Sequence, residues 1–472
     1  MNYTYTEANG QAVFSDVRST YLCIPHSLSG FNNTDTDILT AASGRTIFRF
    51  NGTLDITEND RRCPNCNGKM HVNGCNHQKS LRHLNVGGNF TDISFDHYQF
   101  RCPCCGFSRM QEIPFKADKH RITVPLYQYV TDLLACGTYT LKQVSELTGL
   151  GKNTVKSIDV TRLKAKYTID GKKLCQPENY ARILGIDEFK LHDGNQFATH
   201  IIDVESGHVL WIAHGKKKQV VYDFIDHVGD EWMSHVEAVA CDMNSDYQEA
   251  FEDRYPHLLV VFDHFHIVKN FNEGVINEVR KDEHSRLIAE GNIEAAKKLK
   301  GSKYILTSRL ETLQQKDADA YTEKEITKSS ELFKIPSYKR REGYCARYTE
   351  LLEENQLLFV CDLVKEKLAL AYKSISEDDM RAEIDEIIEL CDSTGNKHFR
   401  WFSRLLYNHY SGIIAHVYYG ASSGKIEGIN NKIKAIRHNG YGYPDDEYFF
   451  LKIIDASRSV YVRNQRSHRK SD

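Results

Sequence analysis

The 472-residue sequence has no long apolar run, and its first residues, MNYTYTEANG, contain no basic stretch followed by an apolar one. A helix that crosses a membrane needs about 18 or more consecutive apolar residues. A secretory signal places a basic segment ahead of an apolar segment. Because both patterns are missing, we expect a cytoplasmic protein without a membrane partner.

The sequence also lacks a strong net charge, since 61 Lys+Arg residues and 64 Asp+Glu residues give a formal charge of −3. A near-neutral chain can still bind nucleic acid if its positive charge is concentrated in one region. Between Arg101 and Cys175, thirteen basic residues stand against six acidic ones. This region is therefore the candidate for contact with phosphate groups. The length exceeds that of one hydrophobic core, so we expect two to four domains.

Thirteen cysteines are present, and several of them cluster. Cytoplasmic cysteines stay reduced, so clustering indicates a metal site rather than disulfides. Two C-x-x-C pairs lie 35 residues apart, and the alternating stretch between them predicts a β-hairpin around Gly87-Gly88. Four thiolates suit a structural Zn²⁺ ion, and the candidates are Cys63, Cys66, Cys102 and Cys105.

Other ligands remain open in this zinc-ribbon-like unit. Cys104 competes within the second pair, and Cys75, His71 and His77 lie nearby. The simpler alternative is that reduced cysteines are buried as small apolar residues.

Two helices joined by a glycine-containing turn are predicted in TLKQVSELTGLGKNTVKSI. Leu141, Val144 and Leu147 would form the inner face of the first helix, and Val155 and Ile158 would anchor the second. A helix-turn-helix of this kind presents the second helix to a DNA groove. Many helical hairpins share the pattern, but the local basic excess favours DNA binding. The exposed candidates are Lys152, Asn153, Thr154, Lys156 and Ser157.

The region 181–263 reads as strands and helices in the order β-β-β-α-β-α-β, which is typical of a mixed α/β sheet. Residues 264–420 are helical in pattern, including one long continuous stretch over 342–373. Residues 422–440 predict one more amphipathic helix. Its isoleucines Ile426, Ile429, Ile433 and Ile436 fall on one face.

Three acidic residues stand out within these elements. Asp187 ends the apolar strand 183–186, and Asp242 ends the strand 236–241. Glu427 shares a polar face of the last helix with Asn431 and Lys434. Converging carboxylates repel one another unless a cation is present, and Mg²⁺ or Mn²⁺ prefers oxygen ligands. An isolated Asp at a strand end is more often a cap or turn residue, so the case depends on all three together.

The blocks GIDEF, VACDMNSDY, FDHFHIVKN and SSGKIEGINNKIKAIRHNGYGY resemble those of the ISL-three family of bacterial insertion-sequence transposases. The resemblance covers nearly the whole chain. It implies an RNase H-like core with a DDE metal site, in which Asp187, Asp242 and Glu427 are the first, second and third acids. The 184 residues between Asp242 and Glu427 would hold a helical insertion.

Asp263 and His266 lie in another block of the resemblance, FDHFHIVKN. They could simply begin a helix, with Asp263 as its N-cap. We favour a role in orienting the metal site or the DNA backbone. Asp263 also remains the alternative to Asp242 as the second ligand, and Asn431 is a further candidate beside the site.

The resemblance implies a DNA transposase that binds terminal inverted repeats, cleaves the strands with Mg²⁺ and transfers them to target DNA, acting at the nucleoid as a homodimer or higher oligomer. The alternatives are a catalytically silent DNA-binding regulator and a nuclease or junction-cleaving enzyme on the same core. The expected fold is multidomain α/β. The chain would begin with an N-terminal segment of unclear fold (1–60). It would continue with a zinc-binding domain (61–115), a helix-turn-helix (116–175), the catalytic core (181–270 and 421–460) and a helical insertion (271–420).

Overall fold

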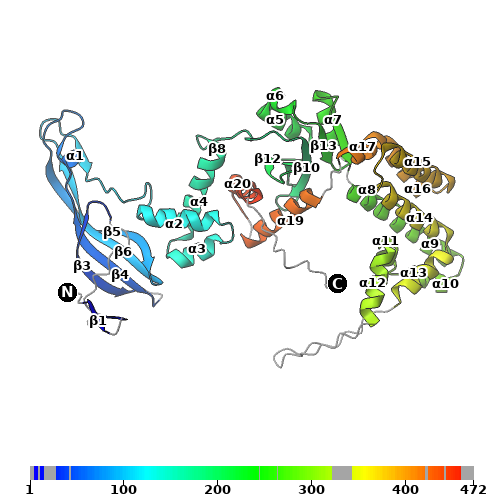
Figure 1. Ribbon diagram of the computed structural model, residues 1–472, viewed down its shortest axis with the longest axis horizontal. Helices are drawn as coiled ribbons and strands as arrows, with labels where there is room; N and C mark the ends of the chain where they lie inside the picture. Colours follow the sequence, from blue (N-terminus) through cyan, green and yellow to red (C-terminus); the bar gives the residue numbers. More distant parts are fainter. Residues whose placement is uncertain are drawn as a thin grey trace. The chain divides into compact units, whose positions relative to one another are not determined.

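The computed structural model describes residues 5–8, 11–14, 28–41, 44–243, 245–262, 264–321, 343–419, 424–440 and 443–458. The chain forms two compact units. One unit contains residues 1–175 and 435–472, and the other contains residues 176–434. Figure 1 labels most of the elements of both units along the chain.

The first unit contains a sheet whose strand order is β3-β4-β6-β5. β3 (Phe31–Thr40) is antiparallel to β4 (Thr46–Leu54), and β4 is parallel to β6 (Asn89–Arg101). β5 (His71–Val86) and β6 form the predicted hairpin. Its turn residues Gly87 and Gly88 both have positive φ, which a tight two-residue turn requires. One sheet therefore spans both of the expected segments, 1–60 and 61–115.

Smaller elements lie before, between and after these strands in the chain. The strands are β1 (Tyr5–Ala8), which pairs with β2 (Gln11–Phe14), and β7 (Ser108–Met110), which pairs with β6. A short helix, α1 (Glu58–Arg61), precedes the first cysteine pair. Strand side chains form the core together with Phe115, which follows β7 in the chain. The strand members include Phe50, Leu81, Ile93 and Phe95.

Three helices follow the sheet: α2 (Val124–Ala135), α3 (Leu141–Thr148) and α4 (Lys152–Tyr167). The turn between α3 and α4 begins at Gly149, whose φ of 72° gives the left-handed cap that ends α3. Val144, Val155 and Ile158 are fully buried, as predicted. The prediction for Leu147 is wrong, because its side chain is 45% exposed and Thr148, one turn after Val144, is buried instead.

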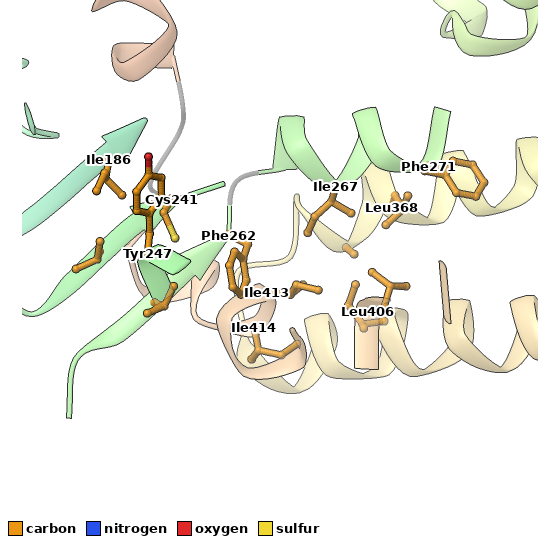
Figure 2. Close-up of a cluster of buried hydrophobic side chains, with 14 of the residues drawn as sticks. Ile186, Cys241, Tyr247, Phe262, Ile267, Phe271, Leu368, Leu406, Ile413 and Ile414 are labelled. Carbon is orange, nitrogen blue, oxygen red and sulfur yellow. The ribbon is translucent and has the colours of Figure 1, made fainter. Parts of the chain in front are cut away.

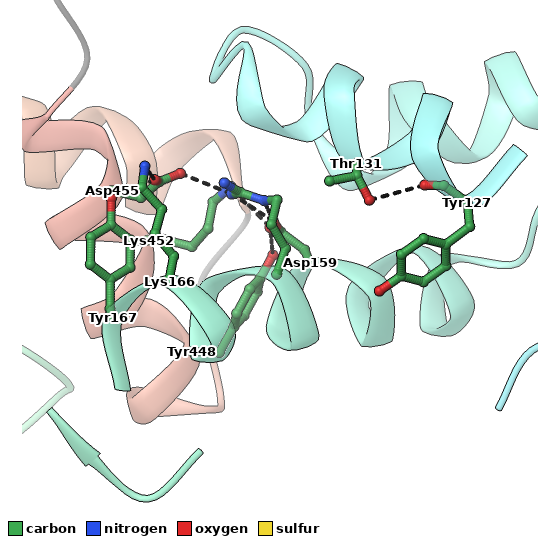
Figure 3. A network of polar contacts seen from close by, with 9 residues as sticks. Tyr127, Thr131, Asp159, Lys166, Tyr167, Tyr448, Lys452 and Asp455 are labelled. Atoms are coloured by element: carbon green, nitrogen blue, oxygen red, sulfur yellow. Dashed lines mark hydrogen bonds and ion pairs between the residues drawn. The ribbon is translucent and has the colours of Figure 1, made fainter. Parts of the chain in front are cut away.

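A buried polar network joins α4 to α20 (Asp446–Ser457) within the first unit (Figure 3). Asp159 is fully buried and accepts hydrogen bonds from Arg162 at 2.8 Å, the Tyr448 hydroxyl at 2.8 Å and Lys452 at 3.0 Å. Arg162 also donates to Asp455 at 2.8 Å. Every charge in this network has a partner, so the network holds the two helices in one register. The short strands β8 (Thr168–Ile169) and β9 (Lys173–Leu174) end this part of the chain.

The second unit is built on a five-stranded sheet with the order β12-β11-β10-β13-β14. The first three strands along the chain are β10 (Ile183–Lys190), β11 (Phe197–Asp203) and β12 (Val209–His214), and they are antiparallel. β13 (Ala238–Cys241) and β14 (Leu259–Phe262) are parallel to β10. The predicted order of strands and helices over 181–263 is confirmed.

Helices accompany this sheet, and one continuous hydrophobic cluster contains side chains of both. The helices along this part of the chain are α5 (Lys218–Val228), α6 (Asp230–Met233) and α7 (Ser245–Arg254). The cluster joins side chains of the sheet region to those of the later helices. Figure 2 shows Ile186, Cys241 and Phe262 in line with Ile267, Phe271, Leu368 and Leu406. The sheet and the helices that follow it therefore share one core.

Helices fill the chain between β14 and residue 419 among the described residues. They are α8 (His264–Phe271), η1 (Asn272–Ile276), α9 (Asn277–Ala289), α10 (Ile293–Leu299), α11 (Lys303–Thr307), α12 (Leu310–Tyr321), α13 (Tyr344–Glu353), α14 (Gln356–Ala371), α15 (Glu377–Ser393), α16 (Lys397–Asn408), α17 (Tyr410–Ile414) and α18 (His416–Tyr419). The predicted continuous helix over 342–373 is wrong. Asn355 divides it, because its side chain accepts a hydrogen bond from the Leu358 amide and caps α14.

The last helix of the second unit is α19 (Gly424–Asn439), whose residues up to Lys434 belong to that unit. Ile426, Ile429 and Ile433 are buried, as the predicted apolar face requires. None of the described helices is long and apolar enough to cross a membrane.

Candidate active site and metal centres

Asp187 and Asp242 lie on neighbouring strands of the second unit. Gly185 of β10 pairs with Ala240 of β13 in parallel register, and two further residues along each strand bring the chain to Asp187 and Asp242. The two carboxylates are therefore placed side by side where this pairing ends, the kind of position where open α/β sheets bind ligands. Asp242 directly follows β13, as predicted.

The position predicted for Asp187 needs a correction. β10 does not end at Ile186 but continues to Lys190, because residues 187–190 pair with β11. Asp187 is opposite His200 in that antiparallel pairing. Asp187 therefore lies inside β10, beyond the last residue that pairs with β13 and where β10 pairs with β11 alone.

Burial raises the pKa of Asp187 above the usual aspartate value, and the charge of Asp242 acts in the same direction. Two hydrogen bonds act against this rise. The Glu188 amide donates to Oδ1 of Asp187 at 2.8 Å, and Nδ2 of Asn430 donates to Oδ2 at 2.6 Å. Two donors thus hold Asp187 in one orientation, but burial and the neighbouring acid still make its ionised form less favourable.

Asp242 has the opposite balance. Burial alone would raise its pKa, but His266 and the Met243 amide outweigh burial and lower it. His266 Nδ1 lies 3.1 Å from Oδ1 of Asp242, and the Met243 amide donates to the same oxygen at 2.7 Å. Both contacts engage Oδ1 of Asp242.

Glu427 comes from the first turn of α19, which lies against β10. A Cβ atom added to Gly185 would be 2.9 Å from Ile426 Cδ1, so a larger residue here would push the Ile426 side chain away from the strand. Glu427 is exposed, and Asn430, one turn later, makes the contact with Asp187. The helix that carries the third acid is therefore tied directly to the strand that carries the first.

The carboxylate oxygens of Asp187, Asp242 and Glu427 are not all close enough to one another to bind one and the same ion. In the described part of the chain, the groups of three or more potential ligands within 4.8 Å of one another lie in the first unit. A pair of ions about 4 Å apart needs carboxylates spread more widely than one ion does. Two observations fit a cation here: the raised pKa of Asp187, and the buried Oδ1 of Asn430, which has no hydrogen-bond partner among the described residues.

The other residues predicted to lie beside the acids differ in their contacts. His266, in α8, contacts Asp242, whereas Asn431 is exposed. Asp263 lies outside the described residues, so its standing as the alternative ligand is unchanged.

Two residues near the site were missed from the sequence. Asn430 interrupts the isoleucine stripe four residues after Ile426 and three before Ile433, and a polar residue on a docked face is the signal that could have identified it. Glu188 follows Asp187 directly. Its pKa is raised by burial and by the charges of Asp187 and Asp242, and Tyr247 donates to it at 3.3 Å.

The four predicted zinc ligands converge in the first unit. Cys63 Sγ lies 3.4 Å from Cys105 Sγ, and Cys66 Sγ lies 3.5 Å from Cys102 Sγ. Four sulfurs around one zinc ion with bonds of about 2.3 Å would be about 3.8 Å apart, so the donor set fits zinc. Backbone amides of the second pair, first that of Cys105, lower the pKa of Cys102 to about 6. Cys104 is exposed and outside the group.

The predicted DNA-contacting residues lie at the start of α4. Lys152, Asn153 and Ser157 are exposed, and Thr154 is half-buried. Lys156 differs from the expectation of a free side chain, because its Nζ pairs with Asp445 at 2.9 Å.

Known proteins resemble this chain over most of its length. A family model described as Transposase, of the ISL-three DDE type, matches residues 184–453. The transposase for insertion sequence element IS1001 of Bordetella parapertussis is 27% identical over 357 residues, which are 75% of this chain and 78% of that protein. The transposase for insertion sequence element IS1557 of Mycobacterium tuberculosis is 23% identical over 280 residues, 56% of this chain and 57% of that protein. The family match begins in β10 and ends in α20, so it includes all three acids.

Proposed function

This chain belongs to the ISL-three family of insertion-sequence transposases, and we propose that it cleaves DNA at the terminal inverted repeats of its element and transfers the freed strands to target DNA. The observation that carries the proposal is the hydrogen bond between Asn430 and Asp187. It connects the helix of Glu427 to the strand of Asp187, beside Asp242.

The proposed catalytic fold is an RNase H-like core. Support comes from the sheet, in which the strands stand in the order third, second, first, fourth and fifth along the chain. The first three are antiparallel, and the last two are parallel to the first. The helices from η1 to α18 would then be the insertion between the second and third acids, and α19 would return the chain to the sheet.

Asp187, Asp242 and Glu427 would hold divalent ions, Mg²⁺ or Mn²⁺. When bound, such ions neutralise phosphate charge and activate the attacking oxygen. His266 contacts Oδ1 of Asp242 and keeps this acid ionised. Asn430 fixes the orientation of Asp187. These contacts preorganise the acids, and phosphoryl transfer depends mainly on such positioning and charge neutralisation.

The first unit would recognise the DNA. Its proposed parts are the zinc-bound hairpin and the helix-turn-helix formed by α3 and α4. Lys152, Asn153 and Ser157 are exposed at the start of α4, where a recognition helix contacts base edges. Two element ends must be brought together for strand transfer, so we propose that the protein acts as a dimer or higher oligomer on DNA.

A cleavage and joining assay tests the proposal. The full-length protein is incubated with Mg²⁺ and a duplex that carries the terminal repeat, and cleaved and joined products are measured. We expect Glu427→Gln to lower both products by at least about 10²-fold while DNA binding persists. Glu294→Gln, which changes an exposed acid of α10, should leave both unchanged.

Two other outcomes would overturn the proposal. Specific binding without cleavage in either Mg²⁺ or Mn²⁺ would indicate a silent DNA-binding regulator. Cleavage without joining, and without preference for the terminal repeat, would indicate a nuclease.

A further inference from the structure

A second group of metal-ligand side chains lies on the long hairpin of β5 and β6, apart from the four-cysteine group. Cys75 and His77 come from β5, and Asp96 comes from β6. His77 Nδ1 is 3.6 Å from Cys75 Sγ and 3.2 Å from Asp96 Oδ2. The three ligand atoms all lie within 4.8 Å of one another. Three different ligand types therefore converge on one point of the hairpin.

A β-bulge produces this convergence. Asn76 pairs with His97 and Lys79 pairs with Phe95, so His77 and Gln78 together stand opposite Asp96. Gln78 adopts a φ of +52°, which is uncommon for a residue other than glycine. Its amide donates to Oδ1 of Asp96 at 3.2 Å, which turns Oδ2 toward His77. Cys75 and His77 are two residues apart and share one face of the strand.

An ion pair between His77 and Asp96 is the simpler explanation. The His77 side chain is 76% exposed and that of Asp96 is 40% exposed, and solvent-accessible pairs contribute little to stability. That pair does not account for Cys75, whose sulfur approaches the same nitrogen atom as the carboxylate does. Nor does a weak pair explain the bulge and the left-handed Gln78 that bring the carboxylate to it.

We propose that Cys75, His77 and Asp96 bind a second zinc-class transition-metal ion, with water completing its coordination. One thiolate, one imidazole and one carboxylate form a donor set that suits zinc and related borderline metals better than magnesium. The site is independent of the proposed catalytic function, since its residues lie in the first unit.

The position of the site suggests what the ion does. The four-cysteine group closes the open end of the hairpin, where His71 pairs with Arg101. The other end supports the helices: Asn85 donates to the Leu147 carbonyl at 2.6 Å, and Phe90 lies against Gly149. An ion between them cross-links β5 and β6 at the bulge and fixes the register of the strands that carry α3 and α4.

Zinc stoichiometry of the full-length protein tests the proposal. Wild type is compared with Cys75→Ser/His77→Ala and with the matched pair Cys104→Ser/His71→Ala, which removes an exposed cysteine and an exposed histidine outside the group. Each protein is saturated with Zn²⁺, freed of excess ion and measured for zinc per chain. We expect the first variant to hold one ion fewer than wild type, and the matched variant to equal wild type. The acids of the second unit are the same in all three proteins, so their contribution cancels.

Cobalt substitution identifies the ligands and controls for folding. We expect the wild-type minus Cys75→Ser/His77→Ala spectrum to show d–d bands with weak charge transfer, as one thiolate produces. The strong charge transfer of the four-cysteine group should persist in the variant. If that signal is lost, Asp96→Asn replaces the variant, because it keeps the size of the side chain. Equal zinc content in wild type and in the folded variant, or an equal loss in the matched pair, would overturn the proposal.

Discussion

Nδ2 of Asn430 donates a hydrogen bond of 2.6 Å to Oδ2 of Asp187, across 243 residues of sequence. Asn430 lies one turn after Glu427 on α19, and Ile426 of the same helix packs on Gly185 of the Asp187 strand. One polar and one apolar contact thus determine where the third acid stands relative to the first. The position of Glu427 depends on the docking of a whole helix rather than on local sequence.

Asn430→Ala should therefore disable catalysis without unfolding the protein. Loss of the hydrogen bond frees Asp187 to rotate and loosens α19, and small misplacements of catalytic groups can cost about 10²-fold in rate. We expect a fall of roughly that size in strand cleavage with unchanged DNA affinity. Asn439→Ala, which changes an exposed asparagine at the end of the same helix, serves as the control and should retain activity. Equal activities of the two variants would contradict the assigned role of Asn430.

His266→Ala should change the pH dependence of cleavage. His266 lowers the pKa of Asp242 against the effect of burial, so its removal leaves burial to raise that pKa. Metal binding needs the ionised carboxylate, and a raised pKa keeps Asp242 protonated to higher pH. The acid limb of the pH–rate profile should therefore move to higher pH, with the deficit shrinking as pH rises. His257→Ala, at an exposed histidine, should keep the wild-type profile. A shift to lower pH would refute this electrostatic role.

Removal of Asp159 should loosen α20 from α4. The variant Asp159→Ala leaves Lys452 without its buried partner, and breaking a buried ion pair typically costs about 3–5 kcal/mol. Tyr448→Phe removes one hydrogen bond and should cost about 1 kcal/mol. Hydrogen exchange of α4 and α20 amides measures both effects, with Asp118→Ala at an exposed acid as the control. Equal exchange in all variants would mean that packing alone holds α20.

Lys152 and Lys156 should differ in their contributions to DNA binding. Lys152 is exposed, so Lys152→Ala should weaken binding to all duplexes and reduce the salt slope by about 1. Lys156 is engaged by Asp445, so Lys156→Ala should have a smaller effect. The variant Asp445→Ala releases Lys156 and should strengthen binding. Affinities measured across a salt series decide the matter, and a larger loss for Lys156→Ala would show that the pair opens on DNA.

Cys102→Ser should remove the structural zinc ion, whereas Cys104→Ser should not. Cys102 is fully buried in the four-cysteine group, and Cys104 is exposed outside it. Structural zinc contributes directly to folding free energy, so loss of the ion should release the hairpin and abolish DNA binding. Zinc content and DNA affinity are measured for both variants. Full zinc occupancy in Cys102→Ser would exclude this cysteine as a ligand.

Short-range patterns made much of the fold predictable from the sequence. The alternating residues around Gly87-Gly88 specify a hairpin, because side chains alternate across a strand and glycine accepts positive φ. The apolar runs 183–186 and 236–241 indicate the buried strands β10 and β13, and the isoleucine stripe indicates the buried face of α19. Such patterns depend only on neighbours within about one turn or one strand.

Other features were not predicted by the local pattern, some of them because they depend on distant partners. Asn355 divides a continuous helical pattern because capping Leu358 competes with helix continuation. On α3, Leu147 is exposed and Thr148 is buried, although the apolar pattern predicts the reverse. The pairing of Lys156 with Asp445 joins residues 289 positions apart.

The sequence by itself predicted the types of element and the two cysteine pairs from residue type and local spacing. The prediction of the three acids also depended on the resemblance to a family. Only the tertiary structure decided that Cys104 stands outside the four-cysteine group, that β10 continues past Asp187, and that Asn430 links α19 to the sheet. The physical reason is that ligand geometry, strand pairing and helix docking are set by contacts between segments far apart in the chain. A local pattern indicates which face of a helix or strand a residue occupies, but not which segment packs against that face.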